Sequence, residues 1–400
     1  MQIKAKHIKY PIFQFSYLIL ILLFSGCKAE TPANGNPVIT GNARFDKYLS
    51  QLENKRVGLV VNQSSLVGET HLVDTLKALG INITSIFAPE HGFRGEAADG
   101  ITVEDGIDMK TSIPVMSLYG KVKKPTDEHL SQVDVMVFDI QDVGTRFYTY
   151  LSTMHWVMEA CAENDVPLIV LDKPNPNGHY VDGPVLEMKH QSIVGMHQIP
   201  VVHGMTLGEL ALMINEENWL SDSLKCDLKV IPVSNWVHGD SYHLPVRPSP
   251  NLPDYEAVSW YPSLCFFEGT TVSVGRGTDN PFTRIGHPEI RNSDFSFTPL
   301  SRQESVYPKH EGKLCFGMDL RGIAPGDSLN LSLLIDYYQK LNKLGEPFFK
   351  KYFTRLAGTE KLQQQIENGL TEVEIRRSWE ADLKIFREKR KKYLLYEDNE

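Results

Sequence analysis

Short apolar runs alternate along the chain with stretches whose apolar residues recur at helical spacing. Nearly continuous apolar runs are typical of parallel strands that are buried on both faces. Strands are therefore predicted at 56–61, 81–88, 134–140, 166–171 and 199–202, and helices at 71–79, 148–162 and 206–214. Thr206 and Glu209 have the spacing of a capping box at the start of the predicted helix 206–214. This order predicts a parallel sheet with crossover helices.

The pattern changes after Asn235. Prolines, aromatic residues and glycines crowd the segment 245–288, and a mixed tail closes with apolar residues at helical spacing from Trp379 to Tyr393. We therefore predict an α/β fold, with a Rossmann-like, mostly parallel sheet domain over 44–240 and a second, smaller α/β domain over 241–400.

The first 27 residues predict a signal peptide. Lysines precede a short apolar run from Leu18 to Phe24, and small residues stand directly before Cys27. This arrangement is similar to a bacterial lipoprotein cleavage site, so Cys27 is expected to be lipidated, with 28–43 as a flexible linker. The chain is then exported and anchored in the cell envelope, and Lys28 favours the outer membrane, facing the periplasm.

Charge and cysteine content exclude several classes of function. The formal net charge of -9 argues against a nucleic-acid partner, which favours a basic surface. Cys161, Cys226, Cys265 and Cys315 lack metal-site spacing and are expected to be buried free thiols, so no metal is predicted. No GxGxxG or Walker motif follows the first strand, so no cofactor is predicted, and no GxSxG elbow is present.

Polar loops follow the predicted strands at 62–65, 89–96, 141–148, 172–178 and 203–204. In an open parallel sheet, the ligand crevice lies beyond the carboxyl ends of the strands. These loops are therefore expected to form one shared site. Their glycines allow close approach of a ligand, and their aromatic rings offer stacking faces for a sugar.

Glycoside hydrolysis requires two carboxyl groups, one to protonate the leaving oxygen and one to act as base or nucleophile. Glu90 at a strand exit is our first choice, although an ion pair with Arg94 would explain it equally well. Glu268 and Asp142 are the choices for the second carboxyl. A buried ion pair with Arg276 is the alternative for Glu268, and a stabilised turn is the alternative for Asp142.

Several segments together resemble the NamZ-type exo-β-N-acetylmuramidases, glycoside hydrolase family 171. They are APEHGFRGEAADG, VFDIQDVGTRFYTY, LDKPNPNGHYVDGP, VVHGMTLGELA, RPSPNLP, FFEGTTVSVGRGTDNPF and WEADLKIFREKRKKYLLY. The resemblance implies a Rossmann-like domain joined to a smaller domain, with the active site between them. It also implies release of terminal N-acetylmuramic acid from the non-reducing ends of peptidoglycan fragments in cell-wall turnover. The family's glutamate in the motif E-H-G-x-R-G falls on Glu90. Glu96 lies beyond this motif, so the resemblance implies no role for it.

Muramic acid bears a lactyl carboxylate, which a guanidinium binds in a bidentate fork. Arg146 or Arg276 is predicted to hold it, with Arg94 serving Glu90. The full set of predicted substrate-binding residues consists of polar and aromatic loop residues: His91, Arg94, Asp139, Arg146, Tyr148, Asn175, Asn177, His203, Asn251, Arg276 and Thr278.

Two other functions compete. A non-catalytic lipoprotein that binds peptidoglycan or muropeptides would use the same cleft, but would release no free muramic acid. An esterase or amidase is disfavoured by the missing serine elbow and the missing metal ligands. The sequence makes no prediction of oligomeric state.

Overall fold

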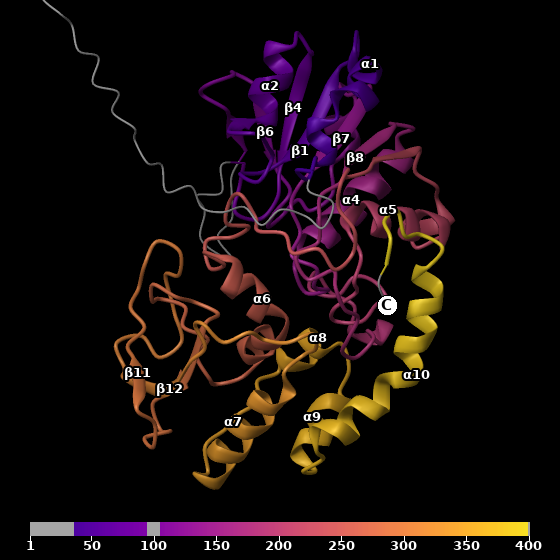
Figure 1. Ribbon diagram of the computed structural model, residues 1–400. Coiled ribbons are helices and arrows are strands. Elements are labelled where there is room, and N and C mark those ends of the chain that lie inside the picture. The colour runs from indigo at the N-terminus through magenta and orange to yellow at the C-terminus, as the bar shows by residue number, and fades with distance from the viewer. Residues whose placement is uncertain (1–35, 94–104, 399–400) are drawn as a thin grey trace, which may run out of the picture. The chain divides into compact units, whose positions relative to one another are not determined.

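A seven-stranded sheet forms the centre of the N-terminal half of the chain (Figure 1). The computed structural model describes residues 36–93 and 105–398. The strand order is β5-β6-β4-β1-β7-β8-β9, and all neighbours pair in parallel except β5 with β6. The strands are β1 (Val57–Val61), β4 (Ile83–Ala88), β5 (Gly106–Ile107), β6 (Pro114–Ser117), β7 (Val135–Asp139), β8 (Leu168–Leu171) and β9 (Leu228–Ile231).

Helices cover both faces of this sheet. On β1, Val60 joins the apolar cluster that contains helices α4 and α5, whereas Leu59 and Val61 join the cluster that contains α1 and α2. This alternation across one strand explains why the strand is apolar at every position. The helices of this part are α1 (Leu49–Leu52), α2 (Leu72–Ala78), α3 (Asp127–Leu130), α4 (Tyr150–Glu163) and α5 (Leu207–Glu216).

Most of the predicted elements of the sheet domain are confirmed. The capping box is present: Glu209 N donates to Thr206 Oγ1 at 3.2 Å, and Thr206 N donates to Glu209 Oε2 at 2.9 Å. The predicted strand at 199–202 is wrong, because Val202 forms isolated bridges to Thr145 and Asp182 instead of extending a strand. A short apolar run is buried equally well in a loop, so periodicity does not separate the two cases.

The second domain is smaller and contains an antiparallel sheet, which confirms the predicted fold class. Its strands β10 (Arg284–His287), β12 (Cys315–Asp319) and β11 (Phe295–Phe297) follow the order β10-β12-β11. Its helices are α6 (Tyr255–Leu264), α7 (Leu331–Lys343), α8 (Phe353–Ala357), α9 (Lys361–Glu367) and α10 (Glu372–Arg390). The short elements of the chain are β2 (Leu66–Val67), β3 (Thr70–His71) and the 3-10 turns η1 (Gly41–Ala43), η2 (Phe45–Lys47), η3 (Met188–His190), η4 (Ser221–Ser223) and η5 (Cys265–Gly269).

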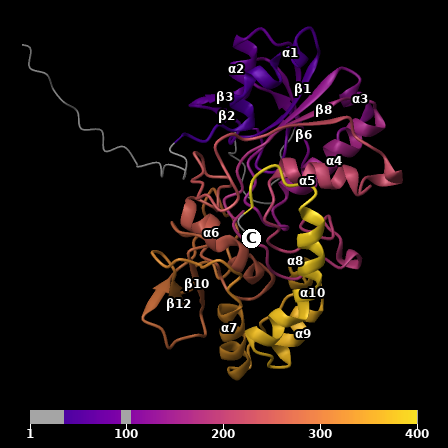
Figure 2. The ribbon, with the colours of Figure 1, turned by 45° about the vertical axis from the view of Figure 1, so that its right-hand side comes forward.

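The segment after α10 returns to the sheet domain, where Figures 1 and 2 show it beside α5. Tyr396 donates its hydroxyl hydrogen to Asp172 Oδ2 at 2.5 Å, and Leu395 N donates to Glu209 Oε1 at 2.8 Å. The C-terminal end therefore fastens the second domain to the loop after β8 and to the start of α5.

Cys161, Cys226, Cys265 and Cys315 are buried free thiols, as predicted. Within 36–93 and 105–398, no helix has the length and apolar character needed to cross a membrane.

Candidate active site

Glu90 and Glu268 line one cavity of about 200 Å³ between the two domains. Glu90 follows β4 by two residues and is 7% exposed. Thr149, at the start of α4, donates its hydroxyl hydrogen to Glu90 Oε2 at 2.7 Å. The first-choice acid of the sequence analysis therefore faces a cavity, with one carboxylate oxygen positioned by a neighbouring element.

The backbone around Glu90 adopts an unfavourable conformation. Gly92 N donates to Pro89 O at 3.0 Å, which closes a tight turn with Glu90 and His91 at its centre. His91 has φ of 71°, in the left-handed region that residues other than glycine adopt at a cost of roughly 1–2 kcal/mol. Phe282, which also lines the cavity, shares this conformation, with φ of 59°. Such conformations cluster at functional sites, where the surrounding structure imposes them.

Glu268 lies in η5 and forms an ion pair with Arg276. Arg276 Nε donates to Glu268 Oε1 at 2.6 Å, and the guanidinium carbon lies 5.2 Å from the centre of the Phe282 ring. The side chains of Arg276 and Glu268 are 19% and 23% exposed, so a ligand in the cavity can reach both. The ion pair with Arg276 is the alternative to a catalytic role for Glu268. The structure shows this ion pair and also places Glu268 in the lining of the cavity.

Aromatic rings form much of the cavity wall. Tyr148 and Tyr150 stand edge to face, with centroids 4.9 Å apart, and Tyr261 contacts Phe147 and Phe282 in the same way. Burial, and next the charge of Glu90, raise the pKa of Tyr150, so its phenol stays protonated at neutral pH. These rings present apolar faces for a sugar together with hydroxyl groups at the edges.

Lys309 supports the segment that carries Glu268. Its ammonium donates to the carbonyl oxygens of Phe267, Glu268 and Val272 at 2.7, 3.1 and 3.2 Å. Burial lowers the pKa of Lys309 to about 7, although the charge of Glu268 opposes this shift. No feature of the sequence distinguished this lysine from a surface lysine.

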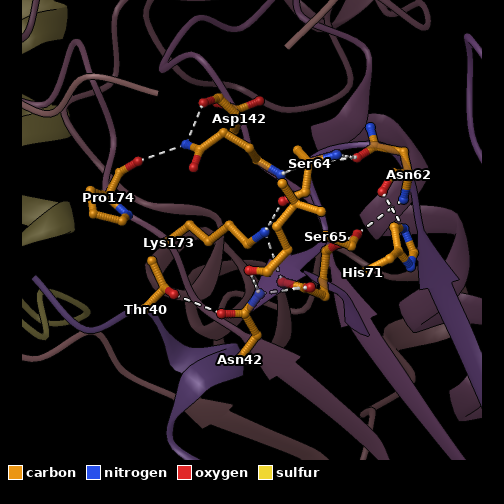
Figure 3. A network of polar contacts seen from close by, with 12 residues as sticks. Thr40, Asn42, Asn62, Ser64, Ser65, His71, Asp142, Lys173 and Pro174 are labelled. Carbon is orange, nitrogen blue, oxygen red and sulfur yellow. Dashed lines mark hydrogen bonds and ion pairs between the residues drawn. The ribbon is translucent and has the colours of Figure 1, made fainter. Parts of the chain in front are cut away.

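A second polar cluster lies where the strand order reverses, between β1 and β7 (Figure 3). Lys173 Nζ lies 3.0 Å from Asp139 Oδ1 and donates to Ser64 O at 2.6 Å, and both side chains are buried. Asn42 Nδ2 donates to the other oxygen of Asp139 at 3.0 Å. The expected single site is therefore divided: the loops after β1 and β8 contribute to this network, whereas the loop after β7 contributes to both places, because its Tyr148 lines the Glu90 cavity.

Asp142 belongs with this second cluster and does not line the Glu90 cavity. Gly144 N donates to Asp142 Oδ2 at 2.7 Å. This contact stabilises a turn, which is the alternative to a catalytic role for Asp142. Burial raises the pKa of Asp142 to about 7, against the lowering effect of the Gly144 and Val143 backbone N–H groups. Of the two predicted second carboxyls, Glu268 is the one that shares a cavity with Glu90.

Arg146, predicted to bind the lactyl group, is fully buried and lies outside the lining of this cavity. Its guanidinium donates to the carbonyl oxygens of Pro184, Ile199, Leu356 and Ala357 at 2.7–2.9 Å. Burial lowers the pKa of Arg146 to about 9. This arginine holds loops together, so Arg276 is the arginine of that pair in contact with the cavity.

Three further predicted ligands have internal partners. Asn175 Nδ2 donates to Met205 O at 2.9 Å, and Asn177 Nδ2 donates to Val143 O at 2.8 Å. His203 is fully buried and accepts from Met205 N at 3.2 Å, and burial lowers its pKa to about 3. These side chains shape the loops and do not line the cavity, whereas His91 and Tyr148 do.

The remaining predicted residues lie either in another cavity or outside the residues that the structure describes. Asn251 and Thr278 line a neighbouring cavity of about 220 Å³. Arg94, Glu96 and Cys27 lie outside the described residues. Thr149, Tyr150, Tyr261 and Tyr352 also line the wall of the Glu90 cavity and were not predicted as site residues. For Thr149 and Tyr150 a signal existed, because both stand at the end of the polar loop that follows β7.

Comparisons with known proteins agree with this arrangement. The family model described as exo-beta-N-acetylmuramidase NamZ, N-terminal, matches residues 57–256. The family model described as exo-beta-N-acetylmuramidase NamZ, C-terminal, matches residues 259–396. The chain is 42% identical over 373 residues to a Bacillus subtilis (strain 168) protein named peptidoglycan beta-N-acetylmuramidase NamZ, which covers 87% of this chain and 89% of the relative.

Two crystal structures of DUF1343 family proteins from Bacteroides fragilis NCTC 9343 share the fold. One is 46% identical with a TM-score of 0.85, covering 91% of this chain and 100% of the other. The second is 28% identical with a TM-score of 0.79, covering 90% and 99%.

Proposed function

The chain belongs to the NamZ family of exo-β-N-acetylmuramidases and is a glycoside hydrolase, and we propose that it releases terminal β-N-acetylmuramic acid from the non-reducing ends of peptidoglycan fragments. The observation that carries this proposal is the placement of Glu90 and Glu268 in one cavity with aromatic walls. Two carboxyl groups in one cavity large enough for a sugar are what glycoside hydrolysis requires. A non-catalytic binding protein has no need for this pair.

In the proposed reaction, Glu90 donates a proton to the glycosidic oxygen as the bond from that oxygen to the anomeric carbon breaks. Water adds its oxygen to the anomeric carbon, and the proton that it gives up replaces the one that Glu90 donated, so that the products are free muramic acid and a shortened fragment. Glu268 is the carboxylate proposed to face the developing positive charge, because the hydrogen bond from Arg276 Nε holds it in the cavity.

Replacement of Glu90 by glutamine tests this role. Glu90→Gln keeps the size of the side chain but removes the proton donor, so turnover of a chromogenic muramic acid glycoside is expected to fall by roughly 10²–10⁴-fold. Glu289→Gln, at a half-exposed glutamate paired with Arg291, is the matched control and should keep full turnover. Near-normal turnover by folded Glu90→Gln would exclude Glu90 as the acid.

We further propose that Arg276 selects muramic acid by binding its lactyl carboxylate. Arg276 reaches the cavity, and a guanidinium binds a carboxylate more strongly than it binds a neutral group. Because Arg276 also supports Glu268, the informative measurement is the ratio of turnover on muramic acid and glucosamine glycosides. Arg276→Met should reduce this ratio, and an unchanged ratio would contradict the assignment.

We also infer that the protein is exported and anchored through a lipid on Cys27, in the outer membrane and facing the periplasm. The support is the short apolar run and the small residues before Cys27. Mass spectrometry of the mature N-terminus should find an acylated cysteine, and Cys27→Ala should release the protein from the membrane fraction. An unmodified residue 27 in the mature chain would contradict the anchor.

A further inference from the structure

One loop of the second domain contacts both segments that carry the ion pair between Glu268 and Arg276. Leu300 N donates to Gly277 O at 2.9 Å, directly after Arg276, and Lys309 Nζ donates to Glu268 O at 3.1 Å. Lys309 is not among the described residues that line the Glu90 cavity. Its effect on a ligand in the cavity therefore has to pass through the residues that it holds.

Lys309 holds the carbonyl end of a helical stretch. Helix α6 ends at Leu264, and η5 continues from Cys265 to Gly269. The last carbonyl oxygens of a helix lack partners within it and carry partial negative charge, which a lysine from elsewhere satisfies. Lys309 bonds to two carbonyl oxygens of η5 and to Val272 O beyond it, so all three hydrogens of its ammonium are used. The backbone on both sides of the Glu268 side chain is fixed in this way.

We propose that Lys309 is a positioning residue for the hydrolysis, which keeps the Glu268 carboxylate in place through the backbone of η5 while its ammonium is charged. This inference rests on the proposed function, because it takes Glu268 to face the positive charge that develops at the anomeric carbon. Such stabilisation depends on a preorganised position of the charged group. A neutral amine has only two hydrogens, so loss of the proton leaves one carbonyl oxygen without this donor and removes a positive charge beside Glu268.

The surroundings of Lys309 place this loss near neutral pH. Burial lowers its pKa from 10.5 to about 7. The titratable groups that face it are Glu268, Cys265, Lys350, Arg276 and His310. Of these, Glu268 and Cys265 favour the ammonium, and the two cations oppose it. The activity that depends on Lys309 is therefore full below about pH 7 and is lost as the pH rises above it.

The contribution of Lys309 to stability has the opposite dependence on pH. Between about pH 7 and the usual lysine value of 10.5, the unfolded chain binds this proton more strongly than the folded protein. Stability from this group therefore increases with pH over the range in which its support of activity decreases. A purely structural lysine would not produce this divergence.

Lys309→Met removes the ammonium and tests its role. At about pH 6, kcat on the chromogenic muramic acid glycoside should fall about tenfold for the lost bonds, with little change in KM because Lys309 does not contact the ligand. Lys309→Arg keeps a charged donor and should recover most of kcat. Lys77→Met is the matched control, because Lys77 Nζ also donates to a carbonyl oxygen, Thr111 O at 2.6 Å, away from the cavity.

The ratio of kcat in Lys309→Arg to kcat in the parent is the sharper measurement. It should rise several-fold between about pH 6 and about pH 9, because the guanidinium stays charged whereas the lysine does not. Ionisation of Glu90 affects both proteins and cancels in this ratio. Urea unfolding over the same pH range gives the folded fraction and the stability of each variant.

A ratio that stays constant with pH, or a kcat per folded molecule of Lys309→Met equal to that of the parent, would overturn the inference. Turnover by the parent that Lys309→Met left unchanged would contradict only the role of Lys309. If the parent released no muramic acid, the proposed function would fail, and this inference with it.

Discussion

The position of the Glu90 carboxylate depends on a hydroxyl group from a different loop. Thr149 Oγ1 donates to Glu90 Oε2 at 2.7 Å from the start of α4. We predict that Thr149→Val, which removes the donor but keeps the shape of the side chain, lowers kcat about tenfold with little change in KM. Thr149→Ser restores the hydroxyl and should recover most of kcat.

Steady-state kinetics on the muramic acid glycoside, with urea unfolding of each variant, would check the role of Thr149. A lower kcat in both Thr149→Val and Thr149→Ser would indicate that the methyl group and packing matter more than the hydrogen bond. A fall in unfolding free energy that parallels the fall in kcat would indicate a structural role.

Asp142 gives the stability of the protein a dependence on pH. Burial raises its pKa from 3.8 to about 7, so between these values the folded state binds the proton more strongly than the unfolded state. The contribution of Asp142 to stability is therefore full below about pH 4 and is lost as the pH rises to about 7. Asp142→Asn removes this loss and retains an oxygen that can accept from Gly144 N.

The free energy of unfolding of Asp142→Asn, relative to the parent, should therefore rise between pH 4 and pH 7 by a few kcal/mol. Urea unfolding at several pH values measures it, since one unit of pKa shift corresponds to about 1.4 kcal/mol. A difference that stays constant over this range would mean that Asp142 titrates normally in the folded protein.

At the scale of elements, the loop after β7 depends on close packing against the loop after β8. Gly144 has φ of 79°, and a Cβ on it would lie 2.0 Å from Asn175 Oδ1. Gly144→Ala must therefore adopt a left-handed conformation and also displace a buried amide. We expect it to lower the free energy of unfolding by roughly 2–5 kcal/mol, the sum of backbone strain and overpacking.

Gly80→Ala separates the cost of backbone strain from the cost of overpacking. Gly80 has φ of 81°, but a Cβ there would have no atom within 4 Å, so this variant should cost only the backbone strain of about 1–2 kcal/mol. Chemical denaturation of both variants measures the difference. Equal costs would mean that Asn175 moves aside freely and that the loops are loosely packed.

Elements whose signals are local were predictable from the sequence. The start of α5 depends on Thr206 and Glu209, three residues apart, and β7 is apolar at nearly every position. The edge strand β9 was missed, because Lys229 and other partly exposed positions interrupt its apolar pattern. The boundary between the domains at residues 240 and 241 stays a prediction.

The candidate site was predictable only in part, because its residues are joined by contacts between distant segments. Glu90 could be predicted from its position at the end of a strand, and Glu268 could be predicted from its position after two aromatic residues. Arg146 looked like a ligand because it stands in a polar loop, but its partners Leu356 and Ala357 lie about 210 residues further along the chain. No local pattern reports such a pairing.

At the scale of the whole molecule, the Glu90 cavity exists only where the two domains meet. Glu90 comes from the sheet domain, and Glu268 comes from the second domain. Arg146 is one of the bonds between the domains, since it follows β7 and donates to the carbonyl oxygens of Leu356 and Ala357 in α8. Leu356 itself lines the cavity, so the arginine supports the site without contacting the ligand.

The net effect of Arg146 on stability follows from two opposing contributions. Burial lowers its pKa from 12.5 to about 9, which corresponds to a cost of about 5 kcal/mol. Its four bonds to carbonyl oxygens, each from a charged donor, contribute roughly 6–12 kcal/mol in total. The bonds outweigh the burial, so Arg146→Met should lower the free energy of unfolding by roughly 1–7 kcal/mol.

Because Arg146 joins the domains, the loss in Arg146→Met should extend to the cavity, and the folded fraction of this variant should also show reduced turnover. Urea unfolding and kinetics on the same sample measure both effects. Arg291→Met is the control, because Arg291 is 73% exposed and its ion pair with Glu289 contributes at most about 1 kcal/mol. If Arg146→Met lost stability but kept full turnover, the cavity would be held together by the C-terminal segment and the other contacts between the domains.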